Sequence, residues 1–180
     1  MKTTNGGALW SPANSGITES SVRDVVVDPL SPQIVYAGTY GGGVFKTTDG
    51  GALWTAINTG LTNLEVSKVV IDPSVPTTLY MSTYSGGVFK TMDGGASWAQ
   101  VNTFAGGLGV EALELDPTSP QIVYAGTSFG GVFRSTDGGS SWDAFNDGLA
   151  TTGVAGLLVD SAGTVYAGTN FEGVYKRTTS

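Results

Sequence analysis

Few side chains in this sequence could carry out catalysis. Its 180 residues include no cysteine and no histidine. A cysteine nucleophile, a zinc site of the usual Cys/His type and an imidazole base are therefore excluded. Carboxylates remain, and glycoside hydrolysis by two carboxylates that face one cleft is the chemistry to test.

Glu111 and Glu114 are the carboxylates that best fit such a pair. They interrupt an internal repeat, in which the corresponding residues are Arg23 and Val26, and we expect them near the mouth of a central channel. Residues three apart on a strand point to opposite faces, so these two cannot form a catalytic pair by themselves. We therefore expect no catalytic residues and no enzyme activity.

The overall composition narrows the class of partner. Eight lysines and arginines stand against 15 aspartates and glutamates, which gives a net charge of −7. Nucleic-acid binding is disfavoured, because it needs a basic surface. The sequence holds no apolar run of about 18 residues and no signal-peptide pattern at its start, so we expect neither a membrane span nor an export signal. The 28 glycines and 7 prolines argue against a helical bundle.

A repeat of 44 residues organises the whole chain. All four tryptophans follow this step, as do two further series of residues, and the segment SPQIVYAGT occurs twice, at 31–39 and 119–127. The three series are Trp10, Trp54, Trp98, Trp142; Val22, Val66, Val110, Val154; and Asp28, Asp72, Asp116, Asp160. A fixed period of this length indicates a repeat architecture.

Each repeat predicts four short strands. In the first repeat they cover 22–28, 33–39, 43–47 and 53–58, and they are β-branched and bounded by turn residues. Four strands in about 44 residues are typical of a β-propeller blade. We therefore predict one all-β propeller domain over 1–180, with four-stranded antiparallel blades at about 22–58, 66–102, 110–146 and 154–177, the last completed by 1–12.

A turn pattern, S/T-x-D-x-G-x-x-W, lies between the third and fourth strands of each repeat. In Thr47-Thr-Asp49-Gly50-Gly51-Ala-Leu-Trp54, the aspartate can accept backbone hydrogen bonds, the glycines can adopt positive φ, and the tryptophan is an apolar anchor. Each copy offers at most one carboxylate, which is too few for a calcium loop, so we expect no metal and no cofactor. The structural residues are Asn5, Trp10, Asp49, Trp54, Asp93, Trp98, Asp137 and Trp142.

This pattern resembles the Asp-box, or bacterial neuraminidase repeat, of sialidases, some glucanases, sortilin-type receptors and photosystem assembly factors. The resemblance covers nearly the whole chain and implies a propeller whose boxes are folding elements. It also suggests an extracellular or periplasmic location. Sialidases of this family use three arginines, but here Arg134 is a repeat residue and Arg177 lies near the end of the chain, which leaves Arg23 alone on an innermost strand. The sialidase arginine triad is therefore absent.

The loops between the second and third strands carry one aromatic residue each, and we take these as candidate ligand-binding residues: Tyr40, Tyr84, Phe129 and Phe171. They could stack on sugars or bind a peptide; alternatively, they could pack between blades. The favoured function is a non-enzymatic scaffold or binding module. The alternatives are a carbohydrate-binding lectin, a fragment or engineered repeat protein without a ligand of its own, and, least favoured, a glycoside hydrolase.

The two ends of the sequence predict how a ring could close. Residues 1–12 hold the turn pattern and a fourth strand, whereas the last repeat has three strands. Pairing these pieces would protect an open sheet edge. Two routes remain open, namely a four-bladed ring from one chain or an eight-bladed ring from two chains that exchange end strands. The second route makes another copy of the chain a partner, besides a protein or glycan.

Overall fold

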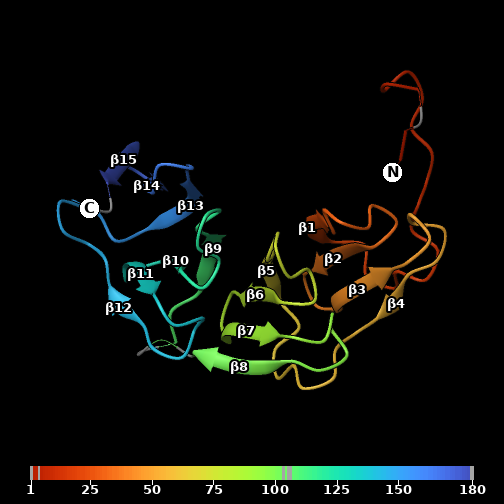
Figure 1. Cartoon of the computed structure of the whole chain (residues 1–180), viewed down its shortest axis with the longest axis horizontal. Coiled ribbons are helices and arrows are strands. Elements are labelled where there is room, and N and C mark those ends of the chain that lie inside the picture. Colours follow the sequence, from red (N-terminus) through yellow and green to blue (C-terminus); the bar gives the residue numbers. More distant parts are fainter. Residues whose placement is uncertain (1, 4, 103, 105–106, 179–180) are drawn as a thin grey trace.

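The computed structural model describes residues 2–3, 5–102, 104 and 107–178. Within them it contains fifteen β-strands, which form four antiparallel sheets. Figure 1 shows the sheets side by side along an open arc, with the N-terminus and the C-terminus at opposite sides. No helix among the described residues is long and apolar enough to cross a membrane.

Three sheets have four strands each, in chain order, and the last sheet has three. The first is β1 (Val22–Val27), β2 (Val35–Thr39), β3 (Gly43–Thr47) and β4 (Thr55–Ala56); the second is β5 (Val66–Ile71), β6 (Leu79–Thr83), β7 (Gly87–Thr91) and β8 (Ala99–Asn102); the third is β9 (Val110–Leu115), β10 (Val123–Thr127), β11 (Gly131–Ser135) and β12 (Asp143–Ala144); the last is β13 (Val154–Val159), β14 (Thr164–Thr169) and β15 (Val174–Thr178).

Local hydrogen bonds explain where the strands end. After β1, the Asp28 carboxylate accepts bonds from the amides of Leu30 and Ser31, at 2.8 and 3.0 Å, which stabilises the turn. The fourth strand of the first sheet is shorter than the predicted 53–58. Its neighbours are bonded elsewhere, because Leu53 N donates to the Asp49 carboxylate and Trp54 N donates to Ser15 O.

The turn between β3 and β4 has the predicted hydrogen bonds. Asp49 Oδ1 accepts from Thr47 Oγ1 at 2.6 Å and from the amides of Ala52 and Leu53 at 2.8 and 3.0 Å. Gly50 and Gly51 adopt φ of 70° and 93°, which other residues rarely do. We call this segment, 47–54, and its equivalents at 91–98, 135–142 and 3–10 the tryptophan hairpins.

Hydrogen bonds hold the acids of these hairpins in the ionised form. Those from Thr47 and Leu53 lower the pKa of Asp49, and those from Ser97 and Thr91 lower the pKa of Asp93. The Ser141 side chain, with its amide, lowers the pKa of Asp137 to about 2. At neutral pH these carboxylates are therefore fully charged acceptors.

The tryptophans are not equally buried. Trp54 and Trp98 are 8% and 4% exposed, and their indole Nε1 groups donate to the carbonyls of Ala13 and Ile57, at 3.0 and 2.8 Å. Trp142 is half-buried and bonds Gly139 O in its own hairpin. Trp10 is 57% exposed, so the expectation that every tryptophan is an anchor is wrong for the first copy. Its hairpin belongs to none of the four sheets formed by the described residues.

The chain does not close into a ring by itself in this structure. The last sheet is β13–β14–β15 and has no fourth strand from residues 1–12. Instead, Lys2 and Ser11 pair with each other, and their two backbone hydrogen bonds of 2.7 and 2.8 Å form a separate hairpin beside the first sheet. The four-bladed ring, one of the two routes that the sequence leaves open, is therefore not formed by the described residues of a single chain.

Candidate ligand-binding face

The β2–β3 loop and the linker between the first two sheets meet at one end of the strands. Tyr40 N donates to Ser21 O at 2.9 Å, and Gly41 N donates to Leu64 O at 2.9 Å. In the next repeat, Tyr84 N donates to Glu65 O at 3.1 Å. These backbone bonds fix the two tyrosines on either side of the same linker.

The two tyrosine rings form a pair. Their centroids are 5.6 Å apart with an interplanar angle of 64°, which is the edge-to-face geometry that aromatic rings prefer. Tyr40 is 41% exposed and Tyr84 is half-buried. The pair thus presents aromatic surface to solvent, in contrast to the fully buried tyrosines on β2, β6 and β10.

An arginine completes this cluster. The guanidinium carbon of Arg23 lies 5.1 Å from the centroid of Tyr40 and 6.0 Å from that of Tyr84, within range of a cation–π contact. The pairing of β1 with β2 shifts register between Val22 and Asp24, which leaves Arg23 outside the regular ladder. Such an irregularity re-aims a side chain. We call Arg23, Tyr40 and Tyr84 the Arg–Tyr cluster.

Sequence reasoning proposed the tyrosines but did not join Arg23 to them. A signal is present in the sequence, since Arg23 is the one arginine on a predicted innermost strand. What the sequence did not show was the register shift, which leaves Arg23 outside the regular ladder of β1 and β2. The equivalent residues in the other repeats are Ser67, Glu111 and Ala155, so the cluster belongs to the first repeat alone.

Phe129 and Phe171 do not join the Arg–Tyr cluster. They are 79% and 90% exposed. The residues before them, Ser128 and Asn170, donate their amides to the linker carbonyls of Gly109 and Gly153, just as Tyr84 does to Glu65. The phenylalanines therefore come one position after the bonded residue and extend into solvent, and Phe129 does not pack between the third and last sheets.

The acidic residues that interrupt the repeat have separate surroundings. Glu114 lines a cavity of about 240 Å³ with Asp24 and Lys68, whose ammonium and carboxylate are 3.1 Å apart. Burial raises the pKa of Glu114, and the hydrogen bond from the Leu115 amide and the charge of Lys68 partly offset this shift. Glu111 lies at the start of β9, at the position where the pairing with β10 shifts register. Among the described residues, no group of three or more acidic side chains could hold a metal.

No protein-family model matches this sequence, and no curated protein matches it. Solved structures do. An ancestral GH74 enzyme aligns over 93% of this chain and 24% of its own, with a TM-score of 0.74 and 29% identity. The computationally designed Ika4 protein aligns over 96% of this chain and 100% of its own, with a TM-score of 0.71 and 16% identity.

A third similar structure is YCF48 bound to D1 peptide, with a TM-score of 0.65 and 17% identity over 87% of this chain and 50% of that one. The chain spans about a quarter of the length of the ancestral GH74 enzyme and 29% of the GH74 enzyme of Niastella koreensis. The likenesses at 16 and 17% identity bear on the fold alone. Together with the 44-residue repeat and the four antiparallel sheets, they identify this chain as an all-β protein with a β-propeller fold.

Proposed function

We propose that this chain is a non-enzymatic binding module built from Asp-box repeats, and that its ligand is a protein or peptide held at the Arg–Tyr cluster. The observation that carries the proposal is the position of Arg23 against both exposed-face tyrosine rings. Tyrosine and arginine are the residue types that contribute most to protein interfaces. The tyrosines repeated on β2, β6 and β10 (Tyr36, Tyr80 and Tyr124) are buried, whereas this pair is exposed enough to contact a ligand.

The charge of the cluster indicates the chemistry of the ligand. A guanidinium held by aromatic faces keeps its N–H donors free for a carboxylate, which it can bind in a bidentate manner. A peptide that presents an acidic side chain beside an apolar one therefore suits the cluster. YCF48, which shares the fold, is seen bound to a peptide, and this supports the binding of a peptide by such a scaffold.

The absence of a suitable catalytic pair supports a non-enzymatic role. Glu114 lies beside a lysine in a small cavity, whereas Glu111 is at the other end of the same strand. Asp24, the second carboxylate of that cavity, is paired with the Lys68 ammonium at 3.1 Å, so it is not a free partner for Glu114 of the kind that glycoside hydrolysis uses.

A lectin is the second candidate, and one observation favours it. Asn63 Nδ2 donates to Ser85 Oγ at 2.9 Å next to Tyr84, which places an amide and a hydroxyl beside an aromatic ring. Such groups bind sugar hydroxyls while the ring stacks on the sugar face. An array of glycans and a library of acidic peptides separate the two candidates.

The test measures binding of an acidic peptide selected from such a library by calorimetry. Tyr84→Ala and Arg23→Ala should each weaken binding about tenfold or more, as expected for interface anchors. Leu30→Ala, in the turn at the opposite end of the strands, is the matched control and should leave affinity unchanged. Equal affinity in all variants, or selection of glycans alone, would contradict the peptide proposal.

A further inference from the structure

We propose that two copies of this chain assemble into one closed ring of eight sheets, in which the last sheet of each copy packs on the first sheet of the other. The argument rests on equivalent positions of the repeat. At each junction inside the chain, a face of one sheet packs against a face of the next sheet. The first sheet and the last sheet each expose a face of this kind, and these two faces match.

The first half is an apolar face on the first sheet. Val22, Val25 and Val27 are 43%, 55% and 47% exposed. Their equivalents on β5, β9 and β13 pack against the preceding sheet, and Val66, Val110 and Val154 are each 0% exposed. A groove of about 460 Å³ lies on this face and is lined by these valines together with Val35 and Trp54. We call it the first-sheet face.

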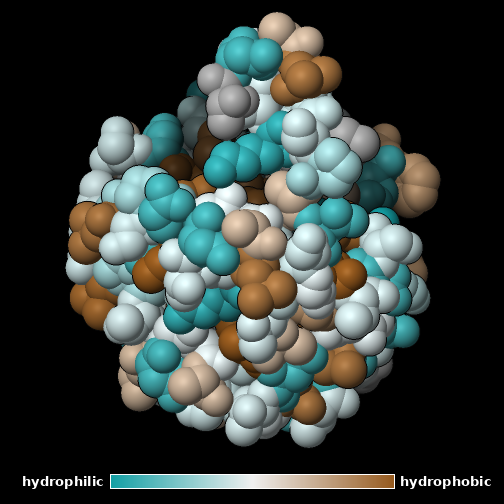
Figure 2. Space-filling model, turned by 90° about the vertical axis from the view of Figure 1, so that its right-hand side faces the viewer, coloured by the Kyte–Doolittle hydropathy of each residue, from teal (hydrophilic) through white to brown (hydrophobic). Residues whose placement is uncertain are grey.

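Figure 2 views the molecule from this side, with the N-terminal segment projecting at the top. Apolar side chains are spread among polar ones on the surface below that segment. A soluble chain rarely leaves three valines of one strand face uncovered, so the first-sheet face is suited to a partner.

The second half is the outward face of the last sheet. Val174 is 73% exposed, whereas its equivalents Val44 and Val88 are 0% exposed. Leu158 is 58% exposed, whereas its equivalent Val70 is 8% exposed. Inside the chain this face is covered by the next sheet. We call it the last-sheet face.

A glycine on this face shows how the two halves would fit. At the first junction, a Cβ at Gly38 would lie 2.6 Å from Cγ1 of Val66, so this glycine leaves room for the valine; at the second junction Ser82 takes the equivalent position. Gly126 stands in the same relation to Val154, at 2.7 Å. Gly168 is the equivalent glycine of the last sheet, and only backbone atoms of Gly156 lie within 4 Å of a Cβ there. By the same step, the side chain that belongs against Gly168 is Val22 of a second copy.

The outer edges repeat a polar contact at each junction. The hydroxyl of Tyr36 and the ammonium of Lys46 both donate to Gly94 O, at 3.4 and 2.9 Å. In the next sheet, Tyr80 and Lys90 both donate to Gly138 O, at 3.2 and 3.0 Å. Each pair thus binds the tryptophan hairpin of the following sheet.

The third copy of this contact is incomplete. The Tyr124 hydroxyl is buried and has no hydrogen-bond partner among the described residues. Burial raises its pKa while the guanidinium of Arg134 opposes the rise, and a guanidinium cannot accept the hydroxyl proton. A buried donor without an acceptor is costly, so this hydroxyl points to a missing carbonyl. The 44-residue step assigns that carbonyl to Gly6.

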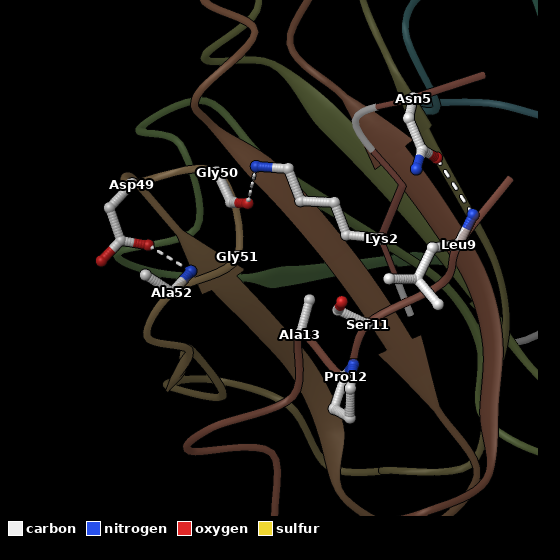
Figure 3. A pocket seen from close by; sticks show the side chains of 10 residues that line it. All are labelled: Lys2, Asn5, Leu9, Ser11, Pro12, Ala13, Asp49, Gly50, Gly51 and Ala52. Carbon is white, nitrogen blue, oxygen red and sulfur yellow. Dashed lines mark hydrogen bonds between the residues drawn. The ribbon is translucent and has the colours of Figure 1, made fainter. Parts of the chain in front are cut away.

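Gly6 belongs to the N-terminal tryptophan hairpin, which is already folded and free to supply it. Asn5 Oδ1 accepts from Leu9 N at 3.0 Å, as Asp49 does from Leu53 in the hairpin of the first sheet. Figure 3 shows this hairpin beside the first sheet, with Lys2 Nζ donating to Gly50 O at 3.1 Å. Lys2 thus makes the contact that Lys46 and Lys90 make at the inner junctions. In the ring, Ser11 would exchange its partner Lys2 for Lys176 of the second copy.

The occupant is a second copy because one chain leaves its first and last sheets apart (Figure 1). The contact joins two different faces, and such a head-to-tail contact ends either in a closed ring or in an open filament. Two copies related by a two-fold axis form both junctions at once and leave no exposed sheet edge, which removes a site of aggregation.

The test uses cysteine pairs, because the chain has no cysteine of its own. Val22→Cys with Gly168→Cys in one chain places a thiol on each half of the proposed junction. Val154→Cys with Gly126→Cys is the matched control within the chain, where the two Cβ positions are 3.2 Å apart, close to disulfide geometry. After oxidation, mass spectrometry under denaturing conditions reads the products.

We expect the control pair to form a disulfide within one chain of 18.4 kDa, and the test pair to form a species of twice that mass. A test pair that closes within one chain, or that stays reduced while the control forms, would overturn the proposal. A ladder of larger multimers would also overturn it, because it would mean that the contact does not close after two copies.

A second variant checks the proposal without cysteines. Val25→Lys places a charge on the first-sheet face and should raise the dissociation constant of the dimer about tenfold or more, as followed by sedimentation. Val75→Lys has a similar exposure, 51% against 55%, but lies in the β5–β6 turn, and it should leave the dimer intact. A wild-type chain that sediments as a monomer at all concentrations, or equal behaviour of both variants, would refute the assembly.

Discussion

Trp98 provides the sharpest test of the tryptophan hairpins as folding elements. Its ring is 4% exposed in the core cluster between the first and second sheets, and its indole N–H donates to Ile57 O at 2.8 Å. Trp98→Ala removes an aromatic ring from that junction. Replacing a buried aromatic residue with alanine costs about 3–5 kcal/mol. For a chain of this size, the melting temperature should fall by roughly 6–20 °C.

Two further variants show which part of the side chain matters. Trp98→Phe keeps much of the apolar surface but leaves the Ile57 carbonyl without its donor, so its cost should lie near 1–3 kcal/mol. Met92→Ala, in the same hairpin, removes a side chain that is 71% exposed and should change stability by less than about 0.5 kcal/mol. Urea unfolding followed by tryptophan fluorescence and circular dichroism measures all three. If Trp98→Ala were no worse than Met92→Ala, the hairpin would not be a structural anchor.

Two pH-dependent predictions follow from the carboxylates. Because hydrogen bonds lower the pKa of Asp49, Asp93 and Asp137 in the folded chain, the stability that they contribute is present above their ordinary pKa of 3.8 and is lost as pH falls toward about 2. Asp93→Asn should therefore flatten the fall in melting temperature over this range. Burial raises the pKa of Glu114, so the folded state disfavours its ionisation and is less stable above pH 4.5. Glu114→Gln should raise the melting temperature at pH 7 and have no effect at pH 4, and a destabilising effect at pH 7 would show that the Leu115 amide and Lys68 together outweigh burial.

The fold could be predicted from the sequence because each repeat carries the same local signals. The strand starting at Val22, the turn at Asp28 and the hairpin at Asp49 all use short-range hydrogen bonds and side-chain types that do not depend on the rest of the molecule. The predicted fourth strand was too long, because Leu53 and Trp54 form hydrogen bonds outside the ladder. A local sequence pattern does not show whether a backbone amide donates to the neighbouring strand or to another acceptor, such as the Asp49 carboxylate or Ser15 O.

The candidate site was less predictable, because it depends on single-residue shifts. Tyr84 and Phe129 look equivalent as aromatic loop residues. Tyr84 donates its own amide to a linker carbonyl, whereas Phe129 comes one position after Ser128, the residue that donates in its loop. The first belongs to a cluster, and the second is 79% exposed. Arg23 enters the cluster through an irregularity in the pairing of β1 and β2, and no residue type marks that irregularity in the sequence.

The same repeat position can be core or surface, and its neighbour decides which. Val22 and Val66 occupy equivalent places on inner strands, but Val66 is covered by the sheet that contains Gly38, and Val22 faces solvent. Burial of an apolar side chain stabilises a protein only if another surface completes it. The repeat thus predicts the contacts of each junction, while the number of junctions that form depends on the assembly. The Tyr124 hydroxyl shows this dependence within a single chain, because it is buried and has no acceptor for its proton among the described residues.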